Sequence, residues 1–208
     1  MQRLPFRRAD PCAAGSPQPN VPLPAFQRYP DFSSPPQGKP YDIPGMASPE
    51  PKRILISDLI SLATVQLQLR GRQRDEVLTE LVARIPEIAE RPEASQSLLR
   101  ALQEREQLHS TGIGDGVALP HARNTLVGLV EKPVVVFGRH DQGIGYGALD
   151  GQPARLFFLL VTANVSQHLA ILARISRLLR DPFLRQNLVS ADRPEKVIGL
   201  IREAEAKL

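Results

Sequence analysis

The residues best suited to chemistry lie in one short stretch, residues 110–124, which reads STGIGDGVALPHARN. Two hydroxyl side chains, Ser110 and Thr111, precede three alternating glycines, whose backbone tolerates positive φ and approaches other groups closely. Pro120 fixes its own φ and restricts the residue before it, so the backbone leading into His121 is stiff. This pattern indicates chemistry at the His121 imidazole, and a surface turn with a solvated histidine is the alternative.

A second histidine, His168, lies near the start of an expected helix that we predict to be capped by Ser166. The first turn of a helix has free N–H groups and a positive dipole end, so it attracts anions and disfavours imidazolium. A neutral imidazole can be a nucleophile or a metal ligand, and a protonated one can be neither. The alternative is a first-turn histidine exposed to water. We expect His109 and His140 to be surface residues.

Two kinds of chemistry fit these residues. In phosphoryl transfer through a histidine, the phosphoryl oxygens need N–H groups, hydroxyls or an arginine, and Ser110, Thr111 and Arg105 are of the right types. The sequence supports metal-assisted hydrolysis less well, because the chain has neither a His-Glu-x-x-His motif nor a cysteine pair. The Gly-x-Ser-x-Gly elbow of serine hydrolases and the Walker A loop are also absent from the sequence.

Composition narrows the class of protein further. The net charge is +4, but the arginines are dispersed among acidic residues rather than gathered in a stripe with aromatics, so we expect no nucleic-acid binding. Cys12 is the single cysteine, which excludes an internal disulfide and a cysteine-based metal cluster and fits a reducing compartment. No apolar run has the length of a membrane span, and no signal peptide is evident, so we expect a cytoplasmic protein without stable membrane insertion.

The chain divides by composition into two parts. Residues 1–51 hold 13 of the 20 prolines and show no apolar periodicity. Such a segment cannot bury enough apolar surface to offset the entropy lost on ordering, so we predict a proline-rich disordered tail. The remaining residues, 52–208, have the apolar patterning of a single folded domain.

Helices and strands alternate in this domain, and they must position the two histidines. Apolar residues at helical spacing, proline and capping signals predict helices over 74–85, 92–107, from Ser166 to the break at 181–182, over 183–189 and over 194–206. The predicted apolar stripe of the helix at Ser166 includes Leu169, Leu172, Ile175, Leu178 and Leu179. Apolar runs predict buried strands over 132–138 and 154–161, with a glycine-rich turn over 141–147. This order predicts an α/β domain, a mixed β-sheet flanked by helices.

The motifs together resemble those of a known family. Arg105-Glu106 and the stretch STGIGDGVALPH ending at His121 resemble the active-site signature of type-2 EIIA domains of the phosphoenolpyruvate-dependent phosphotransferase system, in its mannitol/fructose and nitrogen-related branch. ALDGQP at 148–153 and Gln167-His168-Leu169 match in order and spacing. The resemblance covers about residues 53–206 and implies the same mixed sheet flanked by helices. Ala122 departs from it, because many members have glycine there.

The resemblance also implies roles for individual residues. His121 would accept a phosphoryl group from the histidine phosphocarrier protein HPr or its nitrogen-branch relative. His168 would orient or stabilise the phosphorylated site, and Arg105 would pair with phosphoryl oxygens. Ser110 and Thr111 are expected to bind phosphate, and no metal or cofactor is expected. The chain would then be a phosphoryl-transfer intermediate rather than a turnover enzyme.

Three functions remain open after this comparison. The preferred one is a nitrogen-related regulator that signals through contacts with a target protein, because no membrane component is fused to the domain and a phosphohistidine adds up to about two negative charges. A sugar-specific EIIA that passes phosphate to a separate membrane permease is the second. A domain that only binds partners is the third, and the presence of His121, His168 and Arg105 argues against it.

Overall fold

The structure is a computed structural model that describes residues 54–122 and 128–208. The predicted tail over residues 1–51 lies outside this part. The described helices are α1 (Arg74–Val82), α2 (Pro86–Ala89), α3 (Pro92–Leu108), α4 (Val165–Leu178), α5 (Pro182–Val189) and α6 (Pro194–Glu205). The described strands are β1 (Val65–Gln66), β2 (Gly112–Gly114), β3 (Val117–Ala118), β4 (Val134–Ile144) and β5 (Ala154–Val161). Two short 3₁₀ turns, η1 (Ile56–Asp58) and η2 (Leu62–Thr64), precede β1.

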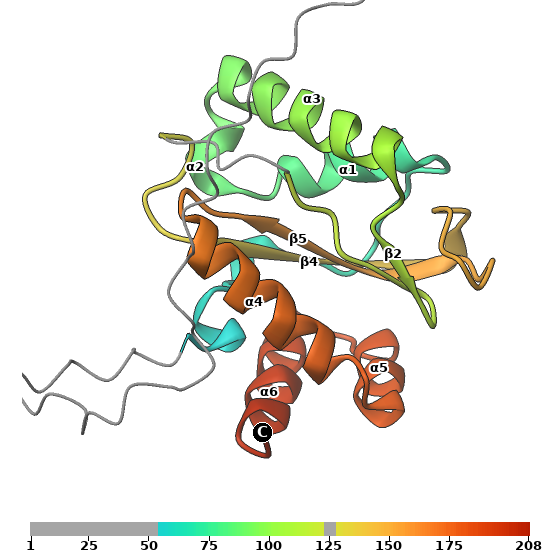
Figure 1. The fold of residues 1–208 in the computed structure, drawn as a ribbon. Helices are drawn as coiled ribbons and strands as arrows, with labels where there is room; N and C mark the ends of the chain where they lie inside the picture. The colour runs from blue at the N-terminus through green and yellow to red at the C-terminus, as the bar shows by residue number, and fades with distance from the viewer. Residues whose placement is uncertain (1–53, 123–127) are drawn as a thin grey trace, which may run out of the picture. The chain divides into compact units, whose positions relative to one another are not determined.

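The strands of the described part form one five-stranded sheet in the order β1-β4-β5-β3-β2. β4 and β5 pair antiparallel, as do β2 and β3, whereas β1 pairs parallel with β4 and β3 parallel with β5. The predicted class, a mixed sheet flanked by helices, is confirmed (Figure 1).

The central strand β5 supplies both hydrophobic cores, as its unbroken apolar sequence predicts. Leu156, Phe158 and Leu160 belong to one buried cluster, and Phe157 and Leu159 belong to another. Successive side chains of a strand point to opposite faces, so a strand buried on both faces is apolar at nearly every position.

Each face of the sheet is covered by its own set of helices. The cluster with Phe157 includes buried side chains of α1, α2 and α3, and the cluster with Phe158 includes those of α4, α5 and α6. Figure 1 shows these two layers on either side of β4 and β5. Within the described ranges no helix is long and apolar enough to cross a membrane.

Three local predictions need correction. Asn164, not Ser166, caps α4, because its side chain accepts a hydrogen bond from the Gln167 N–H. Leu169 was expected in the buried stripe of this helix but is 63% exposed, and Ile171 is buried instead. The segment 141–147 does not begin with a turn: β4 continues to Ile144 through a register shift. Gly143 has φ +76° there, a conformation that glycine adopts without a steric penalty.

Candidate active site

Neighbouring backbone fixes His121 beside the end of the central strand β5. The carbonyl oxygen of Pro120 accepts a hydrogen bond from the Leu160 N–H at 2.9 Å, and His121 forms an isolated parallel bridge with Leu160 of β5. The Nδ1 atom of His121 lies 2.8 Å from the carbonyl oxygen of Leu119. Because a carbonyl oxygen can only accept, Nδ1 carries the proton and Nε2 keeps its lone pair. The ring is therefore oriented with Nε2 as its nucleophilic atom.

His168 lies beside His121, although 47 residues separate them in the sequence. It projects from the first turn of α4, where its N–H donates to the carbonyl oxygen of Asn164 at 2.9 Å. The centroids of the two imidazole rings are 5.2 Å apart, and the planes are inclined by 61°. The two predicted histidines are thus in edge-to-face contact, and both are half-buried.

The surroundings favour the neutral form of both rings. Burial lowers the pKa of His121, the hydrogen bond to Leu119 opposes this shift, and the positive charge of Arg105 adds to it. Burial also lowers the pKa of His168, and the neighbouring His121 lowers it further. At pH 7 each ring then has a lone pair available for attack or for hydrogen bonding.

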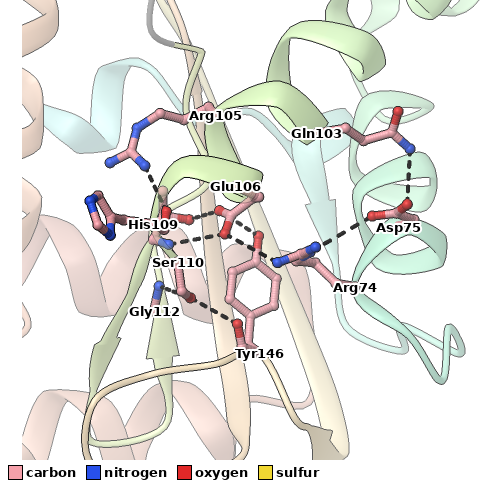
Figure 2. Close-up of polar contacts among 10 residues, drawn as sticks. Arg74, Asp75, Gln103, Arg105, Glu106, His109, Ser110, Gly112 and Tyr146 are labelled. Carbon is pink, nitrogen blue, oxygen red and sulfur yellow. Dashed lines mark hydrogen bonds and ion pairs between the residues drawn. The ribbon is translucent and has the colours of Figure 1, made fainter. Parts of the chain in front are cut away.

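Arg105 lies in the last turn of α3 and is close enough for its charge to act on His121. Its Nη1 donates to the carbonyl oxygen of His109 at 2.7 Å, as Figure 2 shows. This bond ties the Arg105 side chain to the residue that follows α3, and a guanidinium group has five N–H donors in all. Arg105 therefore combines a bond to the residue that follows its helix with a positive charge that acts on His121.

Both hydroxyl groups at the start of the glycine-rich stretch already donate within the protein. The Ser110 hydroxyl donates to the carbonyl oxygen of Tyr146 at 2.8 Å, and the Thr111 hydroxyl donates to the Glu106 carboxylate. Thr111 is buried, with 4% of its surface exposed. In this arrangement the two hydroxyls fix residues 110 and 111 to Tyr146 and Glu106. Phosphate binding by either hydroxyl stays a prediction.

Glu106 was not singled out from the sequence, and it is the buried charge of this region. It is 4% exposed and accepts hydrogen bonds from the Thr111 N–H at 3.0 Å and from the Tyr146 hydroxyl at 3.1 Å. Figure 2 shows this carboxylate between α3 and the tyrosine, with Arg74 4.0 Å away. The signal was present: Leu98, Leu102 and Glu106 recur every four residues, so Glu106 lies on the buried face of α3.

The remaining histidines lie apart from this pair. His109 is exposed, as expected, whereas His140 is half-buried and its Nδ1 accepts a hydrogen bond from the Gly143 N–H at 2.9 Å. Across residues 54–122 and 128–208, no group of three or more histidine, cysteine or acidic side chains is placed to hold a metal ion.

Comparison with known proteins identifies the family. The family model described as "Phosphoenolpyruvate-dependent sugar phosphotransferase system, EIIA 2" matches residues 58–204. The chain belongs to this family. The EIIA match includes both histidines, Arg105 and the whole glycine-rich stretch, so the resemblance predicted from the motifs is confirmed.

Relatives of this EIIA domain fall into two groups. It is 35% identical over 135 residues to a nitrogen regulatory protein of Bradyrhizobium diazoefficiens, a match that covers 64% of this chain and 85% of the relative. It is 33% identical over 150 residues to the fructose-specific EIIABC component of Bacillus subtilis, which covers 71% of this chain but only 23% of that longer protein. The crystal structure of the nitrogen regulatory protein IIA-Ntr from Neisseria meningitidis has a TM-score of 0.62 and 26% identity, and covers 70% of this chain and 98% of that one.

Proposed function

We propose that this EIIA domain accepts a phosphoryl group on Nε2 of His121 from HPr or a nitrogen-branch relative of HPr. The observation that carries the proposal is the hydrogen bond from Nδ1 to the Leu119 carbonyl oxygen, 2.8 Å long, which leaves the lone pair on Nε2. Membership of the family supports the reaction class.

The transfer is a single displacement at phosphorus. The Nε2 lone pair forms a bond to phosphorus while the P–N bond of the donor phosphohistidine breaks, and that electron pair returns to the donor ring. The Nδ1 proton stays in its hydrogen bond, and the Leu119 carbonyl oxygen stabilises the positive charge that develops on the ring. Arg105 attracts the phosphoryl oxygens, and His168 orients the phosphorylated ring from 5.2 Å away.

We further propose a regulatory role of the nitrogen-related type, exerted through contacts with a target protein. The match to the Bradyrhizobium regulator spans most of that protein. The charge of a phosphohistidine is enough to alter a protein interface beside the two rings. Sugar transfer to a separate permease is the second candidate, and the similarity to the fructose-specific component favours it.

The test is incubation of the full chain with radiolabelled phosphoenolpyruvate, Enzyme I and HPr. Wild type should take up label, and His121→Ala should take up none while keeping its far-ultraviolet circular dichroism. Equal labelling of the folded variant would contradict the assignment of His121. Capture of partners by the labelled and unlabelled forms, followed by a sugar-phosphorylation assay with membrane fractions, separates regulator from transporter component.

A further inference from the structure

The buried carboxylate of Glu106 is joined to His121 by an unbroken series of hydrogen bonds. Thr111 donates to Glu106 through both its N–H and its hydroxyl. The carbonyl oxygen of Thr111 in turn accepts from the Leu119 N–H at 3.0 Å. The carbonyl oxygen of Leu119 is the group that holds Nδ1 of His121. Two residues, Thr111 and Leu119, therefore separate the carboxylate from the imidazole.

The negative charge of Glu106 strengthens the first hydrogen bonds of this series. A carboxylate removed from water needs hydrogen bonds to each oxygen, and bonds to a charged acceptor are stronger than neutral ones. Oε2 accepts the Thr111 N–H, and Oε1 accepts the hydroxyls of Thr111 and Tyr146. Thr111 is therefore held by Glu106 at its N–H and its hydroxyl, and its carbonyl oxygen is held by the Leu119 N–H.

A second contact fixes the same turn from the other side. The Ser110 hydroxyl donates to the Tyr146 carbonyl oxygen, and the Tyr146 hydroxyl donates to Glu106. Ser110 is thus tied to Tyr146 directly (Figure 2), and Thr111 is tied to the same tyrosine through the carboxylate. Loss of the negative charge would weaken the hydrogen bonds that Glu106 accepts from Thr111 and from the Tyr146 hydroxyl.

We propose that Glu106 is a positioning residue for phosphoryl transfer: it holds Thr111, and through Thr111 the Leu119 carbonyl group that keeps the His121 proton on Nδ1 and the lone pair on Nε2. This inference rests on the proposed role of His121. Glu106 acts on the tautomer through Thr111 and Leu119, and its negative charge also opposes the lowering of the His121 pKa.

Glu205 provides a matched control. It is also a buried carboxylate, 2% exposed, and accepts hydrogen bonds from the backbone N–H groups of Ile56 and Ser57 and from Nε of Arg174. These partners belong to η1 and α4, on the sheet face opposite to α3. Glu205→Gln therefore disturbs an equally buried charge without interrupting the series that leads to His121.

The experiment compares Glu106→Gln with Glu205→Gln in the full chain. We measure the initial rate of labelling by phosphorylated HPr, the unfolding temperature, and the ¹⁵N chemical shifts of the His121 ring, which report the tautomer without any transfer reaction. Glu106→Gln should lower the labelling rate about tenfold or more, because a displaced reacting group costs up to about 100-fold. It should also reduce the Nδ1–H population, and Glu205→Gln should change only the unfolding temperature.

Two milder variants keep the proposal testable if Glu106→Gln does not fold. Thr111→Val and Tyr146→Phe each remove one hydroxyl donor and leave the Thr111 N–H in place, so each should shift the His121 tautomer and the rate in the same direction by a smaller factor. A wild-type tautomer and rate in every folded variant would overturn the proposal. A rate that falls equally in Glu106→Gln and Glu205→Gln would overturn it as well.

The design separates this proposal from the proposed function. If the wild-type chain takes up no label, phosphoryl acceptance at His121 fails, but the ring shifts of the variants still decide whether Glu106 sets the tautomer. If wild type is labelled and the Glu106→Gln ring is unchanged, the proposed function stands and the role of Glu106 is refuted.

Discussion

The two ring nitrogens of His121 differ in their surroundings, and this difference determines which of them can act as the nucleophile. Nδ1 is held by the Leu119 carbonyl oxygen, so Nε2 is the atom with a free lone pair. Pro120 and the glycine-rich stretch indicate from sequence alone that this imidazole is positioned. The tautomer could not be predicted in that way, because it depends on the direction of one carbonyl group two residues earlier in the chain.

The first prediction concerns pH. The pKa values of His121 and His168 lie below 6.5, mainly because of burial. A pKa lowered on folding means that the folded chain binds fewer protons than the unfolded chain, so this contribution to stability is present above pH 6.5 and is lost as the pH falls. An NMR titration of the rings should give midpoints below 6.5 for both, and the labelling rate should fall only below that pH. Midpoints at or above 6.5 would contradict the account.

The second prediction concerns His168 itself. Replacement by alanine removes the ring that lies 5.2 Å from the acceptor but leaves the Nε2 lone pair of His121 in place. His168→Ala should still accept label on His121, with the initial rate reduced about tenfold or more, as for the loss of one stabilising group. Peptide mapping of the labelled variant checks the site. If peptide mapping of the wild-type protein found all of the label on His168, the roles of the two histidines would be reversed.

At the scale of elements, α4 is the helix that places His168. Its first turn is capped by Asn164, whose side chain accepts from the Gln167 N–H at 3.1 Å, and the Ser166 hydroxyl donates to the same Asn164 oxygen. Both residue types are common caps, but only Ser166 was predicted, two positions after the residue that caps the helix. Leu169 was also misassigned. It follows His168 at the exposed start of α4, before the helix packs onto the sheet.

The third prediction tests this cap. Asn164→Ala should lower the free energy of unfolding by about 1 kcal/mol, the usual cost of losing a helix cap. Ser166→Ala removes a hydroxyl that supports the cap without being the cap, so its effect should be smaller. Chemical denaturation of both variants measures the difference. A larger loss in Ser166→Ala would show that the serine, not the asparagine, caps the helix in solution.

The helices and strands that were predicted best are those whose signals lie within the element itself. The run Leu156–Val161 and the proline starts of α3 and α6 identified those elements nearly to the residue, and α5 begins at Pro182, one residue before its predicted start. The prediction of a turn at the start of 141–147 was wrong because β4 tolerates a register shift between Arg139 and Ile144 while remaining paired with β5. The spacing after Leu98 and Leu102 indicates that Glu106 is buried, but its partner Tyr146, 40 residues away, could not be predicted from the sequence.

On the scale of the whole described domain, Glu205 links the end of α6 to η1 and α4. Burial alone would raise its pKa, but hydrogen bonds from Arg174 and from the N–H groups of Ser57 and Ile56 outweigh burial, and the pKa is lowered. The C-terminal helix is therefore fixed to the first described residues by a charged contact in a nonpolar setting.

The fourth prediction follows from this contact. Glu205→Gln should lower the free energy of unfolding at pH 7 by about 1.5–3 kcal/mol, the range for hydrogen bonds to a charged group. Because the folded pKa is lowered, the carboxylate stabilises the fold above its ordinary pKa of 4.5 and loses this effect as the pH falls further. Denaturation of both proteins from pH 7 to pH 3 should show the difference shrinking in acid. A difference that grows in acid would contradict the account.

The fifth prediction concerns the segment before the domain. The family match begins at residue 58, and residues 54–208 contain both hydrophobic clusters. Removal of residues 1–50 should leave the unfolding temperature and the labelling rate unchanged within error. A clear drop in the unfolding temperature would mean that the segment packs against the domain.

Identification of the phosphorylated atom tests the central claim most directly. The full chain, labelled with ¹⁵N in its histidine rings and phosphorylated through Enzyme I and HPr, would be examined by NMR for one-bond coupling between nitrogen and phosphorus. The account predicts a single coupled nitrogen, Nε2 of His121, with the proton still on Nδ1. Phosphorus on Nδ1 of His121, or on either nitrogen of His168, would contradict it.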